Sequence, residues 1–470
     1  MSEKRSVYAD LRVDGRGWGK WLVLIGVALC AWILGLLAAR PWLALDDEVQ
    51  EEKNASTFPE LRLPNVAPGL DPKYVASVEE SQEVAHRLVQ SFPTDARAAA
   101  AMAILHYLAH DEAGEATCWQ RCLVLDRGFS QAYRCLAERA RDMGEYARAE
   151  ALLREAIVVD PKAPEFHDLL ATALLDQGKL EEAVEVLENH ATINPRSVTT
   201  HILLGQAYLQ LKENEKARSR FETALLLYPT STRAYHGLAQ ACANLGLKED
   251  ADRYRAEFVR LKAIEDRGRQ ESQRDMTDDR VVPRCVADIL TTAGRVYLAH
   301  DRAKDAEEHL LRAATLDPGD SECREALSSL YDQQGRLEEA LRMVEELKEL
   351  EPGSVTHRRN LGILQARLGR FDAAEEAFRE LCALAPEQAV GYAGLAELSL
   401  RTGKEPSEAK TLALKAVRLE PTAWNYFILA AVCEKNGDRS GARSALEQAM
   451  RLDPGNPRYQ AMYESVREKP

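Results

Sequence analysis

The stretch "DQQGRLEEALRMVEELKELEPG", residues 332–353, contains a glycine, an amphipathic run centred on alanine, and a closing proline. Nearly the same phrase recurs as "DQGKLEEAVEVLENHATINP" at 176–195 and as "RLGRFDAAEEAFRELCALAP" at 367–386. The closing prolines recur every 34 residues within two groups, Pro161, Pro195 and Pro229, then Pro318, Pro352 and Pro386; Pro421 and Pro454 follow at steps of 35 and 33. A fixed period of this length indicates an array of structural repeats.

Each period predicts two helices joined by a tight turn. Glycines at 144, 178, 335 and 369 suit a turn that needs a positive φ, and the proline ends the second helix. Small residues would let the paired helices approach closely, and larger residues beside them would fill the remaining space. The small residues are Gly205, Gly294, Gly362 and Ala171 on first helices, and Ala149, Ala183, Ala217, Ala306, Ala340 and Ala374 on second helices; the larger ones are Leu153, Phe221, Leu310 and Phe378. One hairpin cannot bury its apolar stripe alone, so we expect neighbouring hairpins to stack.

The repeat resembles a known family pattern. The residues that carry the resemblance are His201, Leu204, Gly205, Tyr208, Ala217, Phe221, Ala224 and Pro229. They are similar to the tetratricopeptide repeat (TPR) pattern W-x2-L-G-x2-Y…A-x3-F…P, and the resemblance covers residues 96–456. The resemblance implies an all-α, right-handed superhelix, an α-solenoid of about ten helix-turn-helix repeats.

Ten units fit the period, in two groups of five. They are 96–129, 130–163, 164–197, 198–231 and 232–265, then 287–320, 321–354, 355–388, 389–423 and 424–456. Helical segments at 73–91 and 457–467 would cap the two ends. The sequence therefore predicts an N-terminal block at 73–265, a charged joint at 266–286 and a C-terminal block at 287–470. The segment "EDRGRQESQRDMTDDRVV" at 265–282 offers little to bury, so we expect a solvated extension of the preceding helix followed by a joint, with some angular freedom between the blocks.

The N-terminus predicts a single membrane span. Residues 21–39, "WLVLIGVALCAWILGLLAA", carry no charge and are long enough to cross a hydrocarbon core of roughly 30 Å. Basic residues precede the span, so residues 1–20 should form a short cytoplasmic tail and the repeats should lie outside the cytoplasm, in the periplasm if the source is bacterial. Residues 40–72 form an acidic linker that contains five prolines. A cleaved signal peptide, a buried core helix and the reversed topology are the alternatives.

Composition and motifs exclude several classes of function. The net charge is −14 and no basic run lies beyond the N-terminal segment, which argues against nucleic-acid binding. The sequence contains no glycine-rich phosphate loop, no G-x-S-x-G motif and no C-x-x-C-H haem attachment site. We therefore expect no enzymatic activity and no cofactor.

One stretch raises the alternative of a metal site. In "HYLAHDEAGEATCWQRC", residues 106–122, the pairs His106/His110 and Cys118/Cys122 are each four residues apart on predicted antiparallel helices. Two such pairs facing each other could form a tetrahedral His2Cys2 zinc site. The competing interpretation is packing, because Cys122 holds the position that small alanines fill in other repeats.

The remaining candidate surface is the concave face, which the first helices should line. The repeat register places fourteen side chains there: Arg134, Glu138, Arg141, Thr172, Gln206, Gln210, Arg233, His236, Gln240, Asn244, Arg295, Asp332, Arg359 and Arg367. In proteins with this repeat, such a groove often takes an extended peptide or a helix of a partner protein. The Lys/Asn carboxylate clamp of chaperone-binding members is not matched.

These observations predict a membrane-anchored scaffold or assembly factor that binds other proteins. Three alternatives stay open: an assembly factor for a cofactor-bearing client such as a c-type cytochrome, a metal-binding module at 106–122, and a self-associating structural spacer. The sequence leaves the oligomeric state open.

Overall fold

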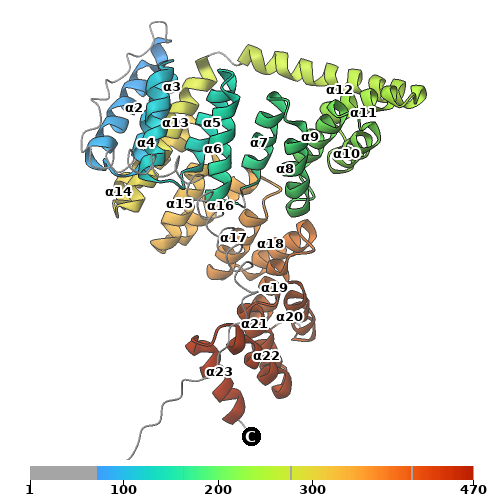
Figure 1. Ribbon diagram of the computed structural model, residues 1–470. Helices are drawn as coiled ribbons and strands as arrows, with labels where there is room; N and C mark the ends of the chain where they lie inside the picture. Colours follow the sequence, from blue (N-terminus) through green and yellow to red (C-terminus); the bar gives the residue numbers. More distant parts are fainter. Residues whose placement is uncertain (1–70, 162, 276–277, 404–405, 469–470) are drawn as a thin grey trace, which may run out of the picture. The chain divides into compact units, whose positions relative to one another are not determined.

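The computed structural model describes residues 71–161, 163–275, 278–403 and 406–468. Within these ranges the chain forms 22 helices and no strand, so the predicted all-α fold is confirmed (Figure 1). The helices are α2 (Pro72–Ser91), α3 (Ala96–Leu108), α4 (Glu112–Leu125), α5 (Ser130–Asp142), α6 (Tyr146–Val159), α7 (Pro164–Asp176), α8 (Leu180–Ile193), α9 (Val198–Gln210), α10 (Asn214–Leu227), α11 (Thr232–Asn244), α12 (Lys248–Asp275), α13 (Asp278–Ala299), α14 (Ala303–Leu316), α15 (Ser321–Gln333), α16 (Leu337–Leu350), α17 (Val355–Arg367), α18 (Phe371–Leu384), α19 (Ala389–Thr402), α20 (Pro406–Leu419), α21 (Ala423–Lys435), α22 (Arg439–Leu452) and α23 (Pro457–Glu468).

Ten helical hairpins make up the array, from α3–α4 to α11–α12 and from α13–α14 to α21–α22. The predicted turn glycines Gly144, Gly178, Gly335 and Gly369 have φ values of 75°, 74°, 74° and 77°. At the same turn position three repeats hold other residues, His110, Lys212 and Asp301, also with positive φ. In each of these seven repeats the turn residue has the left-handed conformation. Glycine adopts that conformation without steric cost.

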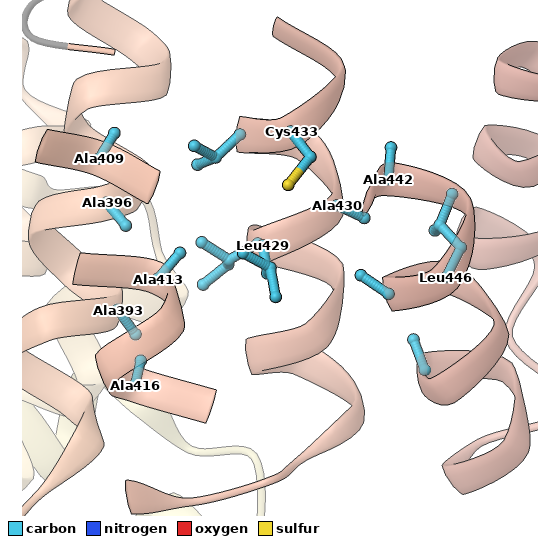
Figure 2. Close-up of a cluster of buried hydrophobic side chains, with 14 of the residues drawn as sticks. Ala393, Ala396, Ala409, Ala413, Ala416, Leu429, Ala430, Cys433, Ala442 and Leu446 are labelled. Atoms are coloured by element: carbon cyan, nitrogen blue, oxygen red, sulfur yellow. The ribbon is translucent and has the colours of Figure 1, made fainter. Parts of the chain in front are cut away.

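Small residues allow the close approach that the sequence predicts. A Cβ atom at Gly205 or at Gly237 would lie 2.6 Å or 2.2 Å from the Phe221 ring. The ring on α10 therefore packs between α9 and α11 and joins two consecutive repeats. The C-terminal block uses alanine for the same purpose; Figure 2 shows Ala393, Ala396, Ala409, Ala413 and Ala416 beside the α21 residues Leu429, Ala430 and Cys433.

Helix α13 packs against α2 and α3, which lie about 200 residues earlier in the chain (Figure 1). Phe92 lies between α2 and α3; its ring stacks on His300 at 4.2 Å and meets Tyr297 edge-on at 5.8 Å. A guanidinium N–H of Arg97, at the start of α3, donates to the carbonyl of Arg295 near the end of α13. The two helices therefore run antiparallel, and we call this α2–α3/α13–α14 contact the seam. The sequence did not predict it.

Helix covers most of the segment that the sequence assigned to a charged joint at 266–286. Helix α12 continues to Asp275 and α13 begins at Asp278, with Pro283 inside it. The predicted angular freedom between the blocks stays a prediction.

The predicted membrane span at 21–39 lies outside the described residues, as do the tail at 1–20 and residues 40–70 of the linker. Among the helices that the structure does describe, none combines the length and the apolar character that crossing a bilayer requires.

Candidate partner-binding surface

The fourteen predicted surface residues all lie on the first helices of their hairpins, from α5 to α17. None of them is buried. The repeat register therefore places each of these side chains where it can meet solvent or a partner. Their involvement in binding stays a prediction.

Several of these residues are already engaged within the chain. The Arg141 guanidinium lies 3.8 Å from the Asp176 carboxylate, and Thr172 donates its hydroxyl to the backbone carbonyl of Asp168 at 2.8 Å. Asn244 donates to the Asn214 amide oxygen at 3.0 Å. Three further contacts involve Asp332 with Arg367, Arg359 with Asn360, and the His236 ring with the Phe258 ring. Five of these side chains contact another helix, while Thr172 and Arg359 bond within their own helix; a partner would have to compete with all seven contacts.

Six predicted residues make no hydrogen bond, ion pair or ring contact with any described residue. They are Arg134, Glu138, Gln206, Gln210, Arg233 and Gln240. All six are at least partly exposed, so their donors and acceptors are available to another chain.

A cavity of about 1370 Å³ lies at this surface. Its lining comes from α3, α5 and α7 of the N-terminal block and from α13 and α15 of the C-terminal block. Of the fourteen predicted residues, Arg134 and Arg295 line it and the other twelve do not. The apolar part of the lining includes Ile104, Phe129, Phe166, Leu298 and Leu330.

The cavity also collects ionisable groups. Arg97 pairs with Asp95 at 2.8 Å, and Arg295 pairs with Glu322 at 2.6 Å. Burial raises the pKa of Asp288 to about 6, and the nearby carboxylate of Asp320 adds to this effect.

Thr291 and the backbone hold Asp320 in place. The Thr291 hydroxyl donates to Asp320 Oδ2 at 2.9 Å, and the backbone N–H of Glu322 donates to Asp320 Oδ1 at 2.8 Å as an N-terminal cap of α15.

Sequence reasoning missed Arg97, Arg284 and Asp288 as cavity residues. Asp288 occupies the second position of its repeat, as the predicted residue Arg233 does, so the register alone could have singled it out. The register could not have shown that α3 and α13 lie together, because that contact joins two hairpins that are not neighbours in the chain.

The metal hypothesis requires His106 and His110 to lie on the same helix, and this prediction is wrong. Helix α3 ends at Leu108, and His110 lies in the turn beyond it with a φ of 53°. His106 instead lies 2.8 Å from the Asp111 carboxylate.

The cysteines of that hypothesis are buried among the helices. The Cys122 thiol donates to the carbonyl of Ala96, and burial raises the pKa of Cys118 to about 12. Among the described residues no group of three or more His, Cys, Asp or Glu side chains is placed to hold a metal ion.

A second polar cluster lies inside the N-terminal block, away from the cavity. Thr200 donates its hydroxyl to the Asp168 carboxylate at 2.8 Å, and His190 Nδ1 lies 3.3 Å from the same oxygen. Burial raises the pKa of Asp168, although Thr200 and His190 oppose that effect. The group links α7, α8 and α9, so it connects neighbouring repeats.

Comparison with known proteins agrees with the fold. Family models described as tetratricopeptide repeat match residues 174–242, and 136–197, 291–355, 325–389 and 359–423; together they cover about half of the chain. No curated protein sequence matches the chain.

Solved structures resemble the chain at low identity. PilF of Pseudomonas aeruginosa is 20% identical, with a TM-score of 0.33 over 57% of this chain and 97% of that chain. TTC0263 of Thermus thermophilus, a thermophilic TPR protein, is 19% identical, with a TM-score of 0.32 over 38% of this chain and 98% of that chain. Yeast Tom70 is 12% identical, with a TM-score of 0.33 over 84% of this chain and 93% of that chain.

Proposed function

We propose that this chain, which belongs to the tetratricopeptide repeat family, holds one or more partner proteins at a membrane surface as a scaffold or assembly factor. The proposal rests on one observation. The first helices present unpaired amide and guanidinium groups, and one of these, Arg134, lines a cavity of about 1370 Å³ that also has apolar walls. Such a surface suits the amides, carboxylates and apolar side chains of a peptide.

The proposed mechanism is recognition by shape and side-chain chemistry, without a covalent step. The stacked hairpins hold their first helices in position, because close contacts at small residues join neighbouring hairpins, as at Gly237 against Phe221 and at Gly394 against Phe378. A partner would therefore meet a preorganised surface and would lose little binding free energy to ordering of the scaffold.

The test is affinity capture with the full chain in detergent micelles. We compare the unchanged chain with a triple variant, Gln210→Ala, Arg233→Ala and Gln240→Ala, which alters three unpaired groups on α9 and α11. The matched control changes Asn189→Ala and Arg451→Ala, two exposed residues on second helices. We expect the triple variant to lose partners that the control retains. Recovery of the same proteins by all three chains would contradict the proposal.

The membrane part of the proposal has a separate test. A phosphatase that is active only outside the cytoplasm is fused to the C-terminus. The predicted orientation of the span at 21–39 requires an active fusion, and an inactive fusion at normal expression would reverse the orientation.

A further inference from the structure

The cavity is a consequence of the seam. Helices α3 and α13 pack directly against each other, while α5 and α7 line the cavity from the N-terminal block and α15 lines it from the C-terminal block. An array in which each hairpin touched only its neighbours would not bring α13 to α3. The cavity is therefore specific to this arrangement and is not a repeated feature of the hairpins.

Four ionisable side chains in the cavity make neither an ion pair nor a hydrogen bond with any described residue, whereas the lining carboxylates Asp317 and Asp320 each accept a backbone N–H. Arg134 and Glu165 come from the N-terminal block, on α5 and α7, and Arg284 and Asp288 come from α13. The other arginines of the lining, Arg97 and Arg295, are both paired. Each block thus contributes one unpaired cation and one unpaired carboxyl group.

The apolar lining lies in the same cavity as these charges. The partly exposed apolar residues are Ile104 and Phe129 of the N-terminal block and Leu298 of α13 in the C-terminal block. An apolar side chain between these groups would be removed from water, which favours binding. Charged groups on either side of it would form charge-assisted hydrogen bonds with the unpaired residues.

We propose that this cavity binds an extended segment of a partner protein that carries an acidic and a basic side chain on either side of an apolar residue. The unpaired guanidiniums of Arg134 and Arg284 bind the acidic side chain, and the unpaired carboxyl groups of Glu165 and Asp288 bind the basic one. A segment with charges of only one sign would leave the opposite groups of the cavity unpaired and desolvated, which disfavours its binding. This inference rests on the proposed function and names the chemistry of the partner.

The experiment selects peptides from a random dodecapeptide library displayed on phage, with the full chain in detergent micelles as the target. We expect enrichment of peptides in which one acidic and one basic residue flank an apolar residue. For a selected peptide, Arg134→Ala and Asp288→Asn should each weaken the Kd about tenfold, the change expected for loss of one charged hydrogen bond. Arg134 is exposed and asparagine has the shape of a protonated aspartate, so both variants keep the fold.

Matched controls and a charge exchange complete the design. Arg451→Ala and Glu181→Gln change exposed, unpaired residues outside the cavity, and they should leave the Kd unchanged. Arg134→Glu should abolish binding of the selected peptide and restore binding of a peptide whose acidic residue is replaced by lysine. No enrichment, enrichment of peptides without both charges, or a Kd that both cavity variants leave unchanged would overturn the inference. The proposed function would survive that result if the unchanged chain still captures partner proteins that the Gln210, Arg233 and Gln240 triple variant loses.

Discussion

Phe221 shows how single residues join consecutive repeats. Its ring is fully buried and lies against Gly205 of its own hairpin and Gly237 of the next one. Because a Cβ at Gly237 would lie only 2.2 Å from the ring, a methyl group there must displace the phenylalanine or the helix.

We predict that Gly237→Ala destabilises the N-terminal block by about 1–3 kcal/mol, the usual cost of overpacking a core. The measurement is urea unfolding followed by circular dichroism. The control is Gly353→Ala, since a Cβ at Gly353 has nothing within 4 Å and its φ is not positive. If both variants lost the same free energy of unfolding, contact with the Phe221 ring would not be the cause of the destabilisation.

A second prediction concerns Asp288. Burial raises its pKa to about 6, above the value of about 4 for an unfolded aspartate, so the folded chain binds more protons between these two pH values. The stability contributed by this site is therefore full below pH 4 and falls as the pH rises to 6. Asp288→Asn should raise stability above pH 6 by on the order of 2 kcal/mol and leave it unchanged near pH 4.

Urea unfolding at several pH values between 4 and 8 checks the Asp288 prediction. Asp252→Asn, at an exposed position of α12, is the control and should show no such pH dependence relative to the unchanged chain. The prediction would be contradicted if the free energy of unfolding of Asp288→Asn differed from that of the unchanged chain by the same amount at every pH.

At the scale of helices, ion pairs connect hairpins that are one repeat apart. Arg336, at the start of α16, contacts Glu307 on α14 at 2.9 Å and also Glu339 at 2.8 Å. Two other ion pairs also connect neighbouring hairpins: Arg370 with Glu338, and Arg220 with Glu188. All of these side chains are partly exposed, so solvent screens the attraction.

We predict that Arg336→Gln lowers the urea midpoint by much less than Gly237→Ala does, and that 1 M salt removes the difference from the unchanged chain. The physical reason is that salt already weakens an exposed pair, whereas it does not relieve overpacking. Unfolding in low and high salt provides the measurement. A loss that persists in 1 M salt would show that Arg336 stabilises through packing on Tyr331, whose ring lies 4.2 Å away.

The helices could be predicted from the sequence because the repeat period encodes contacts between neighbours. Turn glycines, small packing residues and the capping segments at 73–91 and 457–467 all follow from residues close together in the chain. The seam could not be predicted in this way, since Arg97 and Arg295 are 198 positions apart. For the same reason, only Arg134 and Arg295 of the predicted surface residues proved to line the cavity.

At the scale of the whole described chain, the seam predicts association between two separate pieces. Residues 1–275 and 278–470, produced together as two chains, should copurify, because α2 and α3 contact α13 and α14 through Phe92, Asp95 and Glu80. Phe92→Ala combined with His300→Ala removes the stacked rings and should weaken association about tenfold or more. Gel filtration and pull-down at several concentrations check this.

Tyr228→Ala is the matched control for the two-piece experiment, because Tyr228 is an exposed aromatic residue outside the seam. It should leave association unchanged. Two pieces that fold but stay apart would contradict the seam as a stabilising contact.

The two sides of the seam lie far apart in the sequence, and this separation has a consequence during synthesis. A ribosome adds roughly 5–20 residues per second, so the nascent α3 emerges some 10–40 s before the part of α13 that it will contact. During that interval the face of α2 and α3 that will receive Tyr297 and His300 has no native cover. Translation speed and early chaperone contact at this face should therefore affect the yield of correctly assembled protein more than changes at the later hairpins α17–α22.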